Sequence, residues 1–314
     1  MAVLALVPVC ILKEVTTCRL NSVIKSTLTI TLEIIKTEFL TKVTFTCNRD
    51  LHFPVQCTEK DDEIEWSQDP NTEDTFSIQA FIVDKREGKW EIPRKGVVIK
   101  LGDSIGRGGM RECYEAQISH LPEQYDGLAP NGWVAKVPGN TYDLCRKDVQ
   151  TQVIALRLGE IFQQKVKGIK GFGDFPRINP SFLAYREGKT EFLTIEPKIE
   201  QNENRKYRKF INNNGKPTRS GLSCQLGLKC LAFVHWTLVF TDGKFLISDV
   251  QGTEDALTDL QVASVDKKLF SAGNPGKIVF ENFTRTHKCN DFCVLLGLDK
   301  EPPRKLGNRL HRSK

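Results

Sequence analysis

Long apolar runs are missing from this sequence of 314 residues. No run approaches the roughly 18 apolar residues that a membrane-spanning helix needs, so we expect no membrane-spanning segment. The opening stretch, MAVLALVPVCILKEV, is apolar for about a dozen positions, but no basic residues precede it as they do in a signal peptide. We therefore expect a buried strand or helix there, and a cytoplasmic protein with no membrane partner.

A large excess of one charge and a dense cysteine pattern are also absent. The chain has 45 Lys and Arg against 39 Asp and Glu, and this net charge of +6 is too small to indicate a nucleic-acid binder. We therefore expect no nucleic-acid partner. The 10 cysteines are too sparse for a disulfide scaffold, and we expect most of them to be reduced, buried and structural.

The composition that remains is typical of a globular protein with a sizeable core, since 39% of the residues are hydrophobic and 27% are charged. The length predicts one large domain or two. We expect an N-terminal extension of unknown role at residues 1–75, with short strands at 20–50 and an acidic, polar linker at 58–74. The main domain would cover 76–300, and a basic, mobile tail would follow at 301–314.

Strand and helix patterns follow one another along the main domain. Alternating and β-branched residues predict strands at 76–84, 96–105, 111–118, 133–137, 191–200 and 244–252. Helical spacing of apolar residues predicts an amphipathic helix over 147–165. The apolar stretch 222–237 predicts a buried helix, and a polar turn is expected at 209–218.

Two thiols and an imidazole gather near the chain end, at His287, Cys289 and Cys293. They converge if a helix begins at Cys289, because residues four apart share a helix face. Zinc needs four ligands in a tetrahedron, and His235, near the end of the predicted buried helix, is the candidate fourth ligand. A zinc held by four protein ligands would be structural. The alternative is a buried cysteine pair beside a solvated histidine.

Two aspartates follow apolar segments in the second half of the chain. Asp249 ends a predicted strand, and Gln251 lies two residues further on, which is the same side of an extended chain. Asp259 follows in the stretch LTDLQ. A few oxygen ligands of this kind suit Mg²⁺ on a nucleotide. The alternative is that Asp249 caps a turn and Asp259 caps a helix.

The glycine cluster GRGGMR at 106–111 stands between two predicted strands, and Lys136 lies inside the next one. Backbone N–H groups of a glycine turn bind phosphates, and a lysine on a strand pairs with them. The order of glycine turn, strand lysine, helix and metal-binding aspartate is the order of these parts in a protein kinase. The usual H-R-D, D-F-G and A-P-E signatures are absent, so the chain is either an atypical kinase or not a kinase.

Seven motifs in order resemble the alpha-kinase family of atypical serine/threonine protein kinases. They are IEPKIE at 195–200, NNNG at 212–215, AFVHWT at 232–237, SDVQG at 248–252, LTDLQ at 257–261, GNPG at 273–276 and FTRTHKCNDFCVLLGL at 283–298. GGMRECYEA at 108–116 and VAKV at 134–137 match less closely. The chain departs from the usual pattern at Lys198, at Pro275 and in the basic segment before NNNG, all of which bear on substrate choice.

The resemblance implies an α+β fold of two lobes like a protein kinase, with a mainly β N-lobe, a helical C-lobe and a structural zinc. It implies that Lys136 holds the ATP phosphates, that Glu196 lies at the hinge near the adenine, and that Asp249 is the catalytic carboxylate. Gln251 and Asp259 would hold Mg²⁺, and Gly106, Gly108 and Gly109 would cover the phosphates. The zinc ligands would be His235, His287, Cys289 and Cys293, the four that spacing also suggests.

The implied function is transfer of the ATP γ-phosphoryl group to a Ser or Thr of a protein substrate, with Mg²⁺ and a structural Zn²⁺ as cofactors. One alternative is a pseudokinase, in which the same fold senses nucleotide or serves as a scaffold. Another is a zinc-stabilised interaction domain that binds no nucleotide. Nothing in the sequence selects a particular substrate, mode of regulation or oligomeric state.

Overall fold

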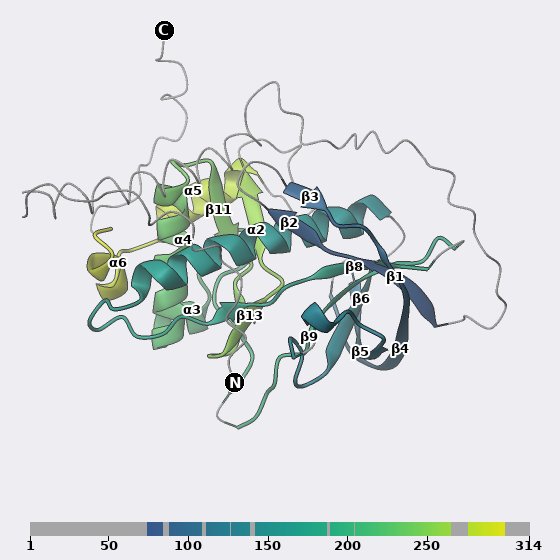
Figure 1. Ribbon diagram of the computed structural model, residues 1–314. Coiled ribbons are helices and arrows are strands. Elements are labelled where there is room, and N and C mark those ends of the chain that lie inside the picture. Colours follow the sequence, from purple (N-terminus) through teal and green to yellow (C-terminus); the bar gives the residue numbers. More distant parts are fainter. Residues whose placement is uncertain are drawn as a thin grey trace, which may run out of the picture.

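The computed structural model describes residues 74–298, except 84–87, 109–110, 126, 139–141, 187–188, 204 and 265–275. The expected apolar start, the strands at 20–50, the linker and the basic tail therefore lie outside the described residues, as does Gly109. The domain boundaries stay a prediction. The described part has two lobes joined by a long helix, as Figure 1 shows.

The N-lobe is a closed barrel with the strand order β1-β4-β5-β6-β9-β8. Its strands are β1 (Thr75–Gln79), β4 (Arg94–Arg107), β5 (Arg111–Ser119), β6 (Trp133–Pro138), β8 (Phe182–Tyr185) and β9 (Phe192–Pro197). Alternation explains the barrel interior: Val97 and Ile99 on β4 are buried, while Val98 between them is partly exposed. The short hairpin of β2 (Phe81–Val83) and β3 (Gly88–Trp90) and the 3-10 helix η1 (Glu123–Tyr125) complete the lobe.

Helix α2 (Tyr142–Val166) runs from the barrel into the other lobe (Figure 1). Ala155, Leu158 and Phe162 recur at helical spacing and are fully buried, which gives the helix its inner face. Gly159 lets β7 (Arg177–Ile178) approach closely, because a Cβ there would lie 2.5 Å from the side chain of Ile178. The predicted helix is confirmed, and it begins five residues before the predicted start at 147.

The C-lobe combines helices with two small sheets. One sheet has the order β10-β12-β13-β7, and the other pairs β11 with β14. Besides β7, the elements of the C-lobe are β10 (Arg208–Lys209), α3 (Arg219–Ser223), α4 (Gln225–Phe240), β11 (Phe245–Ser248), β12 (Gln251–Gly252), β13 (Ala256–Thr258), β14 (Gln261–Ser264), α5 (Lys277–Thr286) and α6 (Asp291–Leu295). Within the described ranges, none of the helices combines the length and apolarity that a membrane crossing requires.

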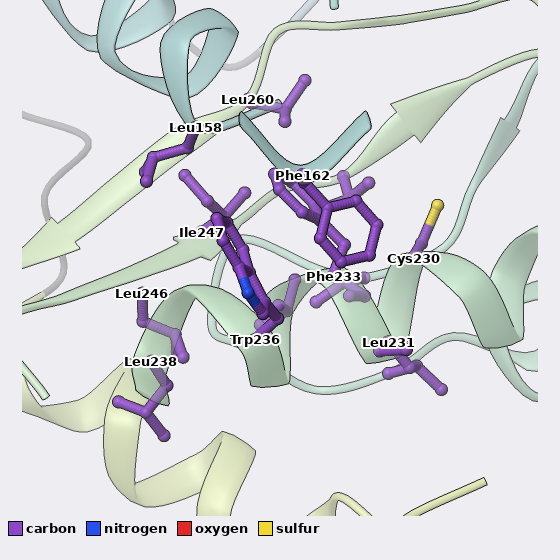
Figure 2. Packing of buried hydrophobic residues seen from close by; sticks show 14 of the residues in the cluster. Leu158, Phe162, Cys230, Leu231, Phe233, Trp236, Leu238, Leu246, Ile247 and Leu260 are labelled. Carbon is purple, nitrogen blue, oxygen red and sulfur yellow. The ribbon is translucent and has the colours of Figure 1, made fainter. Parts of the chain in front are cut away.

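Aromatic side chains from α2 and α4 meet in the C-lobe core, as Figure 2 shows. The Phe162 ring lies 5.0 Å from the Phe233 ring and 5.2 Å from the Trp236 ring, measured between centroids. Such pairs each contribute about 0.5–1.5 kcal/mol beyond the burial of their area. This packing holds α2 against α4.

The predicted single helix at 222–237 is wrong in two respects. The chain forms α3 and then α4, because Cys224 between them is extended, with φ −130° and ψ 155°. Its Sγ accepts a hydrogen bond from the Gly227 N–H and so caps α4. Helix α4 also continues to Phe240, so His235 lies inside the helix and does not close it.

Candidate active site

Lys136 lies between two carboxylates, Glu196 from the N-lobe and Asp259 from the C-lobe. Antiparallel pairing sets Lys136 of β6 opposite Thr194 of β9, and the lysine is only 6% exposed. Its Nζ lies 3.0 Å from Glu196 Oε1 and 3.1 Å from Asp259 Oδ1. Burial alone would lower the pKa of Lys136, but Asp259 and Glu196 outweigh it and raise the pKa. Lys136 is therefore a fixed cation at neutral pH.

Glu196 stands near the end of β9, immediately before the chain passes from one lobe to the other. Its carboxylate turns toward Lys136, and Oε2 accepts a 2.7 Å hydrogen bond from the Thr258 hydroxyl. After Pro197 the strand ends, and the Lys198 N–H donates to the carbonyl of Gly132. The predicted role of Glu196 at a hinge beside the adenine stays a prediction.

Asp259 joins the C-lobe to both Lys136 and a guanidinium of the N-lobe. Arg111 Nη1 lies 3.4 Å from Asp259 Oδ1, and Arg111 Nη2 lies 2.7 Å from Asp148 Oδ2 on α2. Lys136 holds the pKa of Asp259 below its ordinary value, burial opposes this, and Arg111 lowers it further. Asp259 lies just before β14 and not at a helix start, so its interpretation as a helix cap is wrong.

Asp249 follows β11 and is 8% exposed. Its φ is 55°, so the chain is not extended there as predicted, and the strand ends at Ser248. The Gln251 amide still donates to Asp249 Oδ2, over 3.4 Å. Burial raises the pKa of Asp249, although the hydrogen bond from Lys209 acts in the opposite direction.

Lys209 is a further residue of the site, not predicted from the sequence, and its Nζ lies 2.5 Å from Asp249 Oδ1. Strand β10 pairs with β12 so that Lys209 stands opposite Gln251, which brings the ammonium group to the aspartate. The available signal was a lysine three residues before the NNNG motif, inside a basic run that was interpreted only as a departure from the family pattern. The site therefore has a second lysine beside the second aspartate.

The glycine turn lies at the end of the β4–β5 hairpin. In the sheet register, Gly106 on β4 lies opposite Cys113 on β5, and Cys113 lies opposite Lys136 on β6. This end of β4 is therefore two strands away from the lysine. Among the described residues, no atom other than those of its chain neighbours lies within 4 Å of where a Cβ of Gly106 would be. The Gly108 N–H donates to the Arg111 carbonyl over 2.7 Å, which closes the turn.

A separate cluster in the C-lobe brings together the four residues that spacing suggested. His235 of α4, His287 and Cys289 between α5 and α6, and Cys293 of α6 offer ligand atoms that all lie within 4.8 Å of one another. His235 Nδ1 is 3.7 Å from Cys289 Sγ, and His287 Nε2 is 3.6 Å from Cys293 Sγ. Tetrahedral zinc with bonds of about 2.1 Å to nitrogen and 2.3 Å to sulfur separates its ligands by about 3.4–3.8 Å. The donor set therefore fits zinc.

Burial favours the ligand form of both histidines in this cluster. It lowers the pKa of His235 to about 4, and burial together with His235 lowers that of His287 to about 3. Burial raises the pKa of Cys293 to about 11, so a metal is needed to deprotonate this thiol near neutral pH. His287 is 4% exposed, so the alternative with a solvated histidine is wrong. The Asn290 side chain caps α6 and donates to the Leu228 carbonyl, which holds the cluster against α4.

Comparison with known proteins identifies a family that the sequence matches. The profile of the alpha-kinase family matches residues 106–293. Human alpha-protein kinase 3 is 29% identical over 168 residues, which are 51% of this chain and 9% of that protein. Human transient receptor potential cation channel subfamily M member 7 is 32% identical over 189 residues, 57% of this chain and 9% of that protein. The chain thus spans about a tenth of the length of these relatives.

Solved structures show the same fold. The alpha-kinase domain of myosin heavy chain kinase A in complex with ADP matches with a TM-score of 0.59 and 23% identity, covering 72% of this chain and 98% of that one. The same domain in complex with AMP matches with a TM-score of 0.58 and 24% identity, covering 72% and 99%. The expected two-lobed, kinase-like fold is confirmed.

Proposed function

The chain belongs to the alpha-kinase family, and on this basis we propose that it transfers the γ-phosphoryl group of ATP to a Ser or Thr hydroxyl of a protein substrate. The observation that carries the proposal is the set of charged contacts in the site. Lys136 bridges Glu196 and Asp259, and Lys209 contacts Asp249. Phosphoryl transfer depends mainly on such positioning and charge neutralisation.

ATP would bind between the lobes, with its phosphates beneath the glycine turn and beside Lys136. Support comes from the related myosin heavy chain kinase A domain, which was solved with ADP and with AMP. No described atom apart from those of its chain neighbours lies within 4 Å of a Cβ placed on Gly106, so the described residues leave room for a phosphate beside this end of β4. Lys136 and Arg111 supply the cationic side chains that face the same region.

Gln251 and Asp259 are the proposed Mg²⁺ ligands, and Mg²⁺ would neutralise charge on the phosphates when bound. Asp259 suits this role because its pKa lies below the ordinary value, so it stays ionised. Asp249 would orient the acceptor hydroxyl and take its proton. Burial raises the pKa of Asp249, which makes the carboxylate a better base, and Lys209 keeps it ionised and in place.

The four-residue cluster of His235, His287, Cys289 and Cys293 would hold a structural zinc. All four tetrahedral positions are provided by protein side chains, which leaves none for a substrate. Its ligands come from α4, from the α5–α6 connection and from α6, so the ion would tie this end of the C-lobe to α4. The chemistry of the reaction would take place elsewhere, at Asp249.

The test is a phosphotransfer assay with ATP and Mg²⁺ on the purified chain, comparing wild type with Asp249→Ala and Asp249→Asn. A generic basic protein serves as acceptor, and autophosphorylation is read in the same samples. Label incorporated by wild type and lost in both variants supports the proposal. If wild type incorporates no label while ATP raises its melting temperature, the chain is a pseudokinase. If ATP produces neither effect, the chain is an interaction domain without nucleotide.

A further inference from the structure

Thr258 has no assigned role in the proposed phosphoryl transfer, although its hydroxyl contacts Glu196, one of the charged residues of the site. It is 5% exposed, and its hydroxyl donates a 2.7 Å hydrogen bond to Glu196 Oε2. The other oxygen of that carboxylate, Oε1, lies 3.0 Å from Lys136 Nζ. The two oxygens of Glu196 are therefore held from opposite sides, one by the C-lobe strand β13 and one by the N-lobe strand β6.

Lys136 closes these contacts into a ring. Its Nζ also lies 3.1 Å from Asp259 Oδ1, and Asp259 directly follows Thr258 in the chain. Two adjacent C-lobe residues thus bind the two members of the N-lobe ion pair, the hydroxyl binding Glu196 and the carboxylate binding Lys136. Asp259 has a φ of 58°, a left-handed conformation that lets consecutive side chains reach these two targets.

Removing the hydroxyl would leave a buried carboxylate oxygen without its donor, which is strongly unfavourable. The Glu196 carboxylate would then turn further toward the nearest cation, Lys136. Asp259 and the nucleotide phosphates compete for that same ammonium group, so they would lose part of its charge. The hydroxyl thus controls how the charge of Lys136 is divided.

We infer that Thr258 is a positioning residue, whose hydroxyl holds Glu196 so that Lys136 stays available to Asp259 and to the nucleotide phosphates. The inference rests on the proposed function, since it concerns the same site. In the proposed arrangement, Thr258 contacts neither the acceptor hydroxyl nor the nucleotide.

Thr258→Val removes the hydroxyl at nearly constant volume. We expect kcat/KM for ATP to fall about tenfold or more, and the Mg²⁺ concentration for half-maximal activity to rise, because a hydrogen bond to a charged group is lost. Thr258→Ser keeps the hydroxyl and should restore both values. The matched control is Thr241→Val, which removes a buried hydroxyl that donates to the Thr237 carbonyl in the C-lobe core. That variant should keep the KM for ATP and the Mg²⁺ requirement of wild type.

A double-mutant cycle shows whether Thr258 acts through Glu196. In a Glu196→Ala background the hydroxyl has no carboxylate to hold, so Thr258→Val should add little to the loss. Two losses that multiply would overturn the inference, as would a folded Thr258→Val variant with the kcat/KM and Mg²⁺ requirement of wild type.

The inference can be tested separately from the proposed function. The rise in melting temperature with ADP and Mg²⁺ is measured for wild type, Thr258→Val and Thr258→Ser. We expect a smaller rise for Thr258→Val than for the other two. If wild type transfers no phosphate, the proposed function fails, while this comparison still tests Thr258. Equal rises in all three proteins would overturn the inference.

Discussion

The ammonium group of Lys209 lies 2.5 Å from Asp249 Oδ1, where Lys209 is on β10 and Asp249 lies in the short connection between β11 and β12. Asp249 is buried, with a φ of 55°. A buried carboxylate of raised pKa next to one lysine is the arrangement of a general base whose charge state depends on its partner. This pair has a direct consequence for the pH dependence of the reaction.

Lys209→Met should reduce kcat by about a hundredfold, because the proposed base loses its charged partner. Lys209 lowers the pKa of Asp249, so its removal raises that pKa further. Activity requires the ionised carboxylate, which is present above the pKa and lost below it. The acid side of the pH profile of kcat should therefore move to higher pH. Lys206→Met, which removes an exposed lysine of the same segment, should leave the profile in place. An unmoved profile in Lys209→Met would argue against the pairing in solution.

Arg111 connects the charged site to helix α2, since it contacts both Asp259 and Asp148. Arg111→Gln should reduce kcat/KM for ATP about tenfold or more, because a cation near the proposed phosphate site is lost and Asp148 is left buried without this ion pair. Loss of Arg111 also raises the pKa of Asp259, so the Mg²⁺ requirement should increase most at acidic pH. Steady-state kinetics at several Mg²⁺ concentrations test this. Arg157→Gln, in an exposed ion pair of the same helix, is the control.

Zinc content should depend on the four clustered residues and on no other described cysteine. Cys293→Ser should bind less zinc and lose about 3 kcal/mol or more of unfolding free energy, because metal binding contributes to folding. That loss corresponds to a melting temperature lower by about 6–12 °C in a domain of this size. Cys230→Ser, which changes a fully buried thiol outside the cluster, should keep its zinc. Metal analysis and thermal unfolding give the two values, and equal zinc content in the two variants would contradict the assignment.

Phe162 should carry much of the packing between α2 and α4. Phe162→Ala removes a fully buried ring that contacts Phe233 and Trp236, so the unfolding free energy should fall by about 3–5 kcal/mol. Leu222→Ala, at a side chain that is 60% exposed, should change it by about 0.5 kcal/mol or less. Urea unfolding of both variants measures the difference. A loss in Phe162→Ala as small as that in Leu222→Ala would show that the core does not depend on this ring.

Local patterns in the sequence were sufficient for the barrel strands β4, β5, β6 and β9 and for helix α2. Each of these elements repeats its apolar residues with the period of its own backbone, so neighbouring residues alone predict it. The elements β7, β8, β13, β14, α5 and α6 were not predicted individually, because most are too short to show a period. The break at Cys224 was missed because the stretch 222–237 is largely apolar and neither glycine nor proline adjoins Cys224.

The sequence by itself determined which chemical groups were available: the ligand spacing of His287, Cys289 and Cys293, the strand lysine, and the two aspartates that follow apolar segments. Only the tertiary structure decided which of these groups meet. Lys209 reaches Asp249 through the pairing of β10 with β12, and Thr258 reaches Glu196 across the boundary between the lobes. These partners are 40 and 62 residues apart in the chain. Spacing along a sequence constrains contacts within a turn or two, whereas contacts across such separations follow from how the sheets and helices pack.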